Sequence, residues 1–425
     1  MTTATTASTE VQTRRAWKIP VIYLLATVLL GFMAYSAKGD VTIRLRDKSQ
    51  SLAIPDIVTS GPRILVFLLI VMTVLCLWGW ASTILRIRVP RLVEVAVMSL
   101  AVLSTVLGFL VFAATGSSAA LTLTSVLVST IAISTPLIFG SLSGVVSERV
   151  GVVNIAIEGD LLVGAFAGVM AASYFRTPYM GLVAAPLAGA LLGCLLALFA
   201  VRYGVDQIIV GVVLNVLALG LTTFFYQTVM KKVPERLNTN QFSLAPIKIP
   251  GLSEIPVVGP MLFNQTILVY LMYLAVAFLT VYLFRSRWGL RLRACGEHPR
   301  AADTVGINVN RTRALNTILG SAFAGLGGAF FTLGSVLSFT DNISAGNGYI
   351  ALAAMILGKW HPLGAMGAAL MFGFAQAVAR MLPNVAPSIP SDLVAMIPYV
   401  VTIVAVAGFV GKSRPPAAEN VPYVK

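Results

Sequence analysis

Charged residues are scarce in this chain of 425 residues: Asp, Glu, Lys and Arg together make up 11%, whereas hydrophobic residues make up 57%. A soluble domain normally carries about 25% charged residues, so the chain has too few charges to cover a water-exposed surface. The net charge is +14, but the basic residues lie between apolar blocks and not on one face. This pattern argues against a nucleic-acid partner and is typical of a protein embedded in membrane lipid.

Residues that bind metals or form catalytic pairs are equally few. The three cysteines and two histidines show no spacing typical of a metal site or a disulfide framework: Cys76, Cys194, Cys295, His298 and His361. The segment Gly408-Phe-Val-Gly-Lys-Ser413 has two residues between its glycines, whereas a phosphate-binding loop needs four. We therefore expect no catalysis, no metal and no cofactor bound by this chain.

Long apolar blocks are abundant instead. A helix needs about 20 residues to cross ~30 Å of hydrocarbon, and the blocks predict an all-α polytopic membrane protein. A segment at 347–358 is too short to cross, and we expect a half-helix or part of a broken element, which is tolerated where protein buries it. The expected spans are approximately 19–36, 62–85, 92–114, 121–146, 151–173, 179–201, 206–230, 265–285, 314–336, 363–381 and 393–411.

The spans fall into two groups that suggest how the chain is organised. Five segments lie within 91–230 and five within 265–411, and an odd number in each half gives the second half an inverted orientation, as in many transporters. We expect a ten-helix core over 91–411, preceded by two additional helices with an external loop over 19–90. Residues 1–18 form a disordered tail and 412–425 a second tail. The Lys and Arg distribution places both termini in the cytosol.

The most unusual stretch is 285–313, which carries seven arginines against Glu297 and Asp303. Its interior, Pro299–Val305, predicts a short helix, with Pro299 in the first turn and Gly306 at the end. A short helix fixed between two membrane helices can act as a lever: a partner protein that binds it can move the membrane helices. On composition alone, an ordinary positively charged cytosolic loop explains the stretch as well.

Several motifs resemble one known family. The segment Gly289–Val309, GLRLRACGEHPRAADTVGINV, resembles the coupling-helix region of ABC importer permeases that handle monosaccharides, branched-chain amino acids and nucleosides. Gly320–Ala329 fits the small-residue helix of that group. GVVNIAIEG from Gly151 and GNGYIALAAMILGKW from Gly346 are most similar to the nucleoside branch. The resemblance covers roughly 91–411, and Asp160 stands where an apolar residue such as Met is expected.

The resemblance implies a multi-pass permease in the cytoplasmic membrane of a prokaryote. Two permease subunits, here two different homologous chains, form the pathway, and an extracytoplasmic substrate-binding protein or lipoprotein delivers the nucleoside. Separate ATPase subunits hold ATP and Mg²⁺ and dock on the coupling-helix loop 286–312. The expected coupling residues are Gly296, Glu297, His298, Pro299, Ala301, Ala302, Asp303, Thr304 and Gly306.

Polar and aromatic residues within the spans are candidates for the substrate pathway. Glu158 follows Asn154 by four residues, which places both on one face of the expected helix. Asn154 is the best pathway candidate, whereas Glu158 suits a structural role because a neutral nucleoside does not require a full charge. Aromatic rings can stack on a nucleobase. The full set of candidates is Asn154, Glu158, Asn215, Phe139, Phe166, Asn347 and Tyr349.

Two other interpretations remain open. The same machine can carry a monosaccharide. An ion-coupled secondary transporter, with Glu158 or Asp160 carrying a proton, also agrees with an inverted repeat and buried acids, but it has no need of the Gly-Glu-His-Pro loop at Gly296–Pro299.

Overall fold

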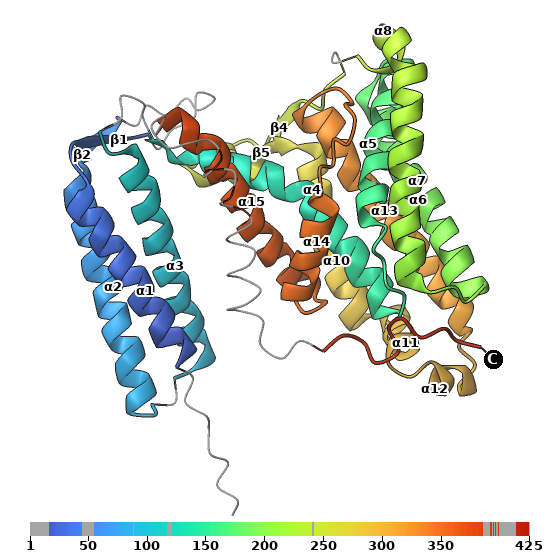
Figure 1. Ribbon diagram of the computed structural model, residues 1–425, viewed down its shortest axis with the longest axis horizontal. Coiled ribbons are helices and arrows are strands. Elements are labelled where there is room, and N and C mark those ends of the chain that lie inside the picture. Colours follow the sequence, from blue (N-terminus) through green and yellow to red (C-terminus); the bar gives the residue numbers. More distant parts are fainter. Residues whose placement is uncertain are drawn as a thin grey trace, which may run out of the picture. The chain divides into compact units, whose positions relative to one another are not determined.

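The computed structural model describes residues 17–44, 55–87, 89–116, 121–239, 242–385 and 414–424, together with 392, 394, 396 and 398. The predicted tail 1–18 and the predicted last span 393–411 lie almost wholly outside the described residues. The described chain is mainly helical (Figure 1) and divides into two compact units. Among the described residues, unit 1 comprises 17–44, 55–87, 89–116, 121 and 384–385, and unit 2 comprises 122–239, 242–383, 392, 394, 396, 398 and 414–424.

Unit 1 contains three long helices: α1 (Lys18–Ser36), α2 (Gly61–Ile84) and α3 (Arg91–Ala114). Glycines allow them to pack closely, because a Cβ added at Gly79 of α2 would lie 2.9 Å from the Tyr23 ring of α1. Strands β1 (Asp40–Arg44) and β2 (Ile57–Ser60) pair antiparallel with Asp40 opposite Ser60, and β3 (Leu121–Thr122) follows at the unit boundary. The sequence predicts two additional helices and a core that begins at residue 91. That boundary stays a prediction, although α3 groups with α1 and α2.

Unit 2 is built from seven long helices and several short elements. The long helices are α4 (Leu123–Arg149), α5 (Ile157–Tyr174), α6 (Pro178–Ala197), α7 (Gln207–Thr228), α10 (Ile267–Arg285), α13 (Val309–Phe330) and α15 (Pro362–Val385). The short helices are α8 (Pro234–Leu237), α9 (Val258–Phe263), α11 (Arg287–Glu297), α12 (Pro299–Thr304) and α14 (Asn347–Leu357). The strands β4 (Pro246–Lys248) and β5 (Asn264–Thr266) pair antiparallel.

Helix α13 lies at the centre of unit 2 and packs against α4, α5 and α6. Small residues bring these backbones together. A Cβ added at Gly320 would lie 2.5 Å from Ser147 Oγ of α4, and one added at Gly328 would collide with the Leu161 carbonyl of α5. Four polar residues of α13 are also buried, so the centre of this unit is not purely apolar: Arg313, Asn316, Thr317 and Ser321.

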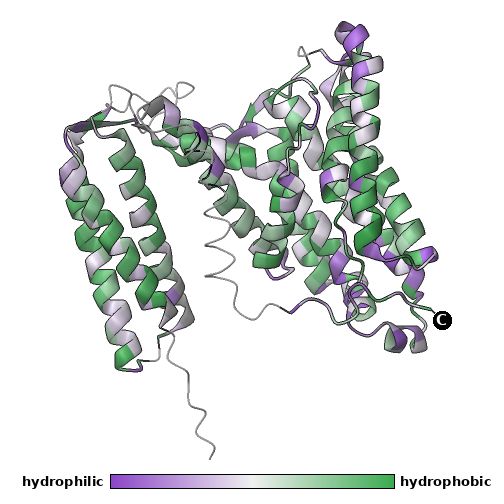
Figure 2. Cartoon of the chain, viewed as in Figure 1, coloured by the Kyte–Doolittle hydropathy of each residue, from purple (hydrophilic) through white to green (hydrophobic). Residues whose placement is uncertain are grey.

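Ten described helices are long and apolar enough to cross a membrane. They correspond to ten of the expected spans, and α14, with 11 residues, is the expected short segment. The prediction of an all-α polytopic membrane protein is therefore confirmed. In unit 2 the hydrophilic residues gather mainly at the two ends, near α8 and near α12 (Figure 2).

Candidate functional site

Between α4 and α5 the chain leaves the helical conformation inside unit 2. Helix α4 ends at Arg149, Gly151 has a φ of 91°, and α5 begins only at Ile157. The segment Val150–Ala156, which we call the α4–α5 break, is almost entirely buried. Buried backbone groups need partners, so the partners of this segment show what holds it.

Side chains of α7 supply those partners. The Gln207 Oε1 atom accepts a 2.7 Å hydrogen bond from the Val153 N–H. Asn215 donates from Nδ2 to the Ile155 carbonyl at 2.9 Å, and its Oδ1 accepts from the Gly159 N–H at 2.8 Å. Non-helical backbone within a bundle is tolerated where protein satisfies it in this way. Helix α7 therefore acts as the scaffold on which the α4–α5 break rests.

The placement of Asn154 corrects one expectation. Asn154 lies in the break and not in a helix, so the prediction that Asn154 and Glu158 share a helix face is wrong. Its Oδ1 accepts from the Ala156 N–H at 3.0 Å, and its Nδ2 donates to Ser143 Oγ at 3.2 Å. The side chain is fully buried. Asn154 thus orders the approach to α5, and its contact with substrate stays a prediction.

Glu158, in the first turn of α5, holds the start of α14. Its Oε1 accepts hydrogen bonds from Ser344 Oγ at 2.6 Å and from the Gly346 N–H at 2.8 Å, and its Oε2 accepts from the Gly348 N–H at 2.6 Å. The free N–H groups of a helix start favour a carboxylate. A Cβ added at Gly348 would lie 2.5 Å from the Glu158 backbone, so this contact requires glycine. These bonds explain how an acid is accommodated inside a span.

Three other predicted residues gather around the same helix start. Asn347 Oδ1 accepts a long, 3.4 Å hydrogen bond from Gln376 Nε2. Tyr349 receives a 3.4 Å hydrogen bond from Asn215 Nδ2 at its hydroxyl, and 52% of its surface is exposed. The structure therefore brings Glu158, Asn215, Asn347 and Tyr349 together at the start of α14. We call these four residues the α14 cluster.

The two predicted phenylalanines lie elsewhere. Phe139 is fully buried in the hydrophobic core, and a Cβ added at Gly327 of α13 would lie 2.7 Å from its Cβ. Phe166 packs edge-on against Phe339, with ring centroids 5.3 Å apart. The structure does not bring either ring into the α14 cluster, and their role in the pathway stays a prediction.

Helices α11 and α12, which contain much of the arginine-rich stretch, lie at the end of α4 where the α4–α5 break begins. The predicted short helix is present as α12, with Pro299 in its first turn, and Gly306 follows it with a φ of 83°. Ser286 caps α11 by accepting from the Gly289 N–H at 2.9 Å, and Asn308 caps α13 by accepting from the Arg311 N–H at 3.0 Å. Caps at both junctions fix where each helix begins.

One side of this region is packed and the other is exposed. A Cβ added at Gly296 would collide with the Arg149 carbonyl, so α11 lies directly on the end of α4, and Ala302 of α12 is buried. The outward-facing residues of the predicted coupling set are exposed: Glu297, His298, Ala301, Thr304 and Gly306. Such a helix offers a rigidly mounted surface to a partner.

At the end of unit 2 that contains α11 and α12, His361 lies close to an arginine. The His361 ring stacks on Phe284 with centroids 4.6 Å apart, and the Arg149 guanidinium lies over the same phenylalanine ring at 5.7 Å. Burial and the charge of Arg149 both lower the pKa of His361. Both effects favour the neutral form of His361.

Sequence reasoning missed Gln207 and Ser344, which hold the α4–α5 break and the α14 start. A signal for Gln207 exists in the sequence: Gln207, Gly211 and Asn215 recur every four residues and share one face of α7. Gly211 belongs to this set because a Cβ there would lie 3.0 Å from the Ile155 side chain. Nothing local marks Ser344, because its partner lies 186 residues away.

Comparison with known proteins identifies relatives. A family model described as "Branched-chain amino acid transport system / permease component" matches residues 126–406. The guanosine ABC transporter permease protein NupQ of Bacillus subtilis is 41% identical over 70% of this chain and 95% of its own length. The nucleoside ABC transporter permease protein NupC of Lactococcus lactis is 40% identical over 69% and 94%. The putative glucose ABC transporter permease protein TsgC13 of Haloferax volcanii is 33% identical over 59% and 75%. No solved structure matches the chain.

Proposed function

The chain belongs to the family of branched-chain amino acid transport system permease components, and from that membership we propose that it forms the membrane pathway of an ABC importer for nucleosides. The proposal that the cargo is a nucleoside rests on sequence identity. The chain is 41% and 40% identical to permeases named for guanosine and nucleosides, and each of these is covered over nearly its whole length. TsgC13, named for glucose, is less similar and less fully covered.

The α14 cluster agrees with a neutral cargo that carries a ring. Both oxygens of the Glu158 carboxylate accept hydrogen bonds from backbone and hydroxyl donors, which gives this acid a structural role at the start of α14. Beside it, Tyr349 offers an exposed aromatic face, and stacking on a base is tolerant of the base's identity. Asn347 adds an amide that can donate to and accept from ribose or base.

Energy reaches the pathway from a separate ATPase subunit. Helix α12 and the exposed residues around it are the docking surface, and the ATPase holds ATP and Mg²⁺. Motion of α12 moves α11, which lies against the end of α4 through Gly296. From there the α4–α5 break and Glu158 lead to the start of α14. Opposed movements of these elements then give alternating access.

The remaining parts of the machine follow from the same proposal. A second, homologous but different permease completes the pathway. An extracytoplasmic binding protein or lipoprotein delivers the nucleoside on the far side. The chain lies in the cytoplasmic membrane of a prokaryote with both termini in the cytosol, so that α12 faces the ATPase.

Uptake into reconstituted vesicles tests the proposal. Vesicles that contain both permeases and the ATPase, supplied with the binding protein and ATP, take up labelled guanosine, and unlabelled nucleosides compete whereas glucose does not. Omission of the ATPase or of ATP abolishes uptake. Uptake driven by a proton gradient alone would refute the ABC mechanism, and competition by glucose instead of nucleosides would reassign the cargo.

A further inference from the structure

The described C-terminal segment, residues 414–424, lies on the arginine-rich end of unit 2, and we call it the C-terminal strap. In Figure 1 it runs past α11 toward the end of the chain. The Ala418 N–H donates to the Gly296 carbonyl at 2.9 Å, and the Ala417 N–H donates to Glu297 Oε2 at 3.3 Å. Ala418 is buried, and Tyr423 packs against the hydrophobic core. The strap is therefore joined to the residues that immediately precede α12.

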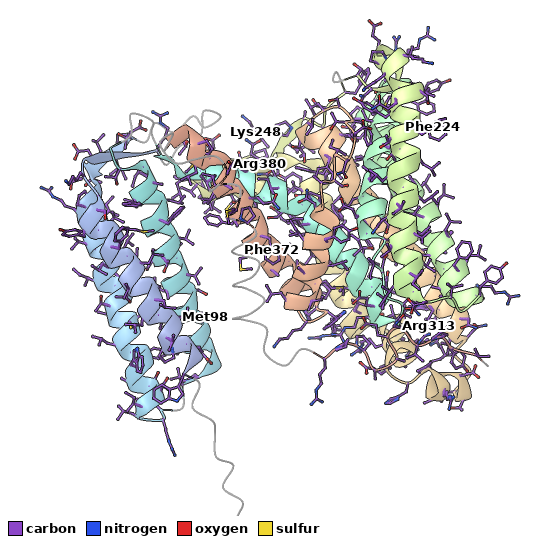
Figure 3. All side chains as sticks on the ribbon, in the orientation of Figure 1. Met98, Phe224, Lys248, Arg313, Phe372 and Arg380 are labelled. Atoms are coloured by element: carbon purple, nitrogen blue, oxygen red, sulfur yellow. The ribbon has the colours of Figure 1, made fainter. Side chains whose placement is uncertain are left out.

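A buried arginine on α13 fastens the strap. Arg313, labelled in Figure 3, is 2% exposed. Its Nη1 donates to the Val421 carbonyl at 2.7 Å, and its Nη2 donates to the Ala418 carbonyl at 3.2 Å. Its remaining described acceptor is the Cys295 carbonyl of α11, at 3.5 Å. A buried guanidinium deprived of its acceptors is strongly unfavourable, so the strap is integral to this end of the molecule.

Arg313 and Ala418 of the strap also lie against the α4–α5 break at Gly151. A Cβ added at Gly151 would lie 2.7 Å from Arg313 Nη2 and 3.1 Å from the Ala418 carbonyl. On the other side, the Glu419 carboxyl hydrogen-bonds to that of Glu148 near the end of α4, and Glu148 also accepts from Trp360 Nε1. Residues of α11, α13, the α4–α5 break and the strap thus meet within one small region.

We propose that the C-terminal strap is a positioning element that binds the α11–α12 lever to the α4–α5 break, so that motion of α12 reaches the substrate pathway. The inference rests on the proposed function, because it needs an ATPase that moves α12. Gly296 itself packs directly on the Arg149 carbonyl and near the Gly151 amide. The strap donates hydrogen bonds to Gly296 and Glu297 and accepts hydrogen bonds from the Arg313 guanidinium. These bonds make the lever and the break move as one body.

The test compares two shortened chains in the complete reconstituted transporter. Removal of residues 414–425 deletes every strap contact, whereas removal of 424–425 alone leaves them all and serves as the control. The quantity measured is nucleoside imported per ATP hydrolysed. We expect this ratio to fall about fivefold without 414–425, within the range that loss of a coupling contact produces, while ATP hydrolysis persists. An unchanged ratio would overturn the inference.

A second variant covers the case in which the shortened chain does not fold. Arg313→Lys keeps the charge but replaces the planar fork with a single ammonium, and we expect faster hydrogen exchange at Ala417 and Ala418 together with a lower import ratio. If only one of these changes, or neither, the inference is overturned. Failure of the proposed function looks different, because the unaltered transporter would then show no ATP-driven uptake of nucleosides at all.

Discussion

At the scale of single residues, Glu158 shows how a carboxylate can be stable inside a membrane helix. Insertion of an acid at a span centre costs at least about 2.5 kcal/mol, and no arginine or lysine pairs with Glu158 among the described residues. Instead, two backbone N–H groups at the start of α14 and one hydroxyl satisfy both oxygens. The sequence interpretation of a structural role agrees with this geometry, and its reason, the capping of a distant helix, is visible only in three dimensions.

Replacement of this carboxylate therefore has a defined outcome. Glu158→Gln retains the size but turns an NH₂ donor toward N–H groups, so at least one hydrogen bond is lost and donors face each other. We expect a loss of about 1–3 kcal/mol in stability, measured as the shift in denaturant-induced unfolding in detergent, together with reduced ATP-driven uptake. The control is Glu235→Gln on the exposed helix α8, which should change neither. Equal stability of both variants would contradict the capping role.

Glu419 gives a prediction about pH. Burial raises the pKa of Glu419 from its ordinary value of 4.5 to about 7, and the hydrogen bond to Glu148 partly opposes this rise. Between pH 4.5 and about pH 7, Glu419 therefore holds a proton in the docked strap that it does not hold in the released strap. Docking is strongest at low pH and weakens as pH rises through about 7. No further weakening from this group occurs at higher pH.

Hydrogen exchange at the Ala418 amide measures this dependence directly. After correction for the intrinsic exchange rate, protection of that amide should fall between about pH 4.5 and about pH 7 and then level off, as Glu419 of the docked strap ionises. Glu419→Gln carries no charge at either pH and should remove the difference. Protection that stays constant in the unaltered chain, or that falls equally in the Gln variant, would show that Glu419 does not control docking.

At the scale of elements, the apolar blocks predicted ten described spans and the short α14, but they placed the gap between α4 and α5 at 147–150, whereas the structure places it at Val150–Ala156. Most residues of this segment are as apolar as those of a helix, so hydropathy does not locate the start of α5. The α4–α5 break is fixed by Gln207 and Asn215 of α7, more than 50 residues along the chain, and pattern reading along one segment contains no such partner. The same limit explains why Asn154 was expected in a helix.

Helix α12 was predicted correctly because its signals are local: Pro299 at its start and Gly306 after its end. Its proposed role in coupling can be tested by reversing the charge of the exposed residue Glu297, at the end of α11, or by deleting α12. We expect Glu297→Lys, or deletion of Pro299–Thr304, to lower ATP-driven uptake about tenfold, a typical size for a lost coupling between two sites, while insertion into the membrane stays normal. Uptake and ATP hydrolysis are measured in the same vesicles. Normal coupled uptake in both variants would remove α12 from the coupling path.

At the scale of the whole molecule, unit 1 is distinct from the part shared with relatives. The family match begins at residue 126, and NupQ, aligned over 95% of its length, leaves about 30% of this chain uncovered. The helices α1, α2 and α3 form their own compact unit. The sequence assigned two additional helices, because the start of the core was placed at residue 91 from the count of spans.

This separation predicts that unit 2 contains the substrate pathway and the coupling surface. A chain that lacks residues 1–120 should still insert and support ATP-driven nucleoside uptake, at a rate similar to that of the full chain, when it is reconstituted with the same partners. The measurement is the initial uptake rate per inserted permease. Complete loss of uptake by a shortened chain that inserts normally would show that unit 1 takes part in transport.

The four-residue repeat of Gln207, Gly211 and Asn215 on α7 has a use outside this protein. A row of one amide, one glycine and a second amide along an otherwise apolar helix indicates a neighbouring non-helical backbone that needs donors, acceptors and room. In other apolar sequences, such a row can be sought on the later helices of the bundle, where it would locate buried non-helical connections more accurately than hydropathy does.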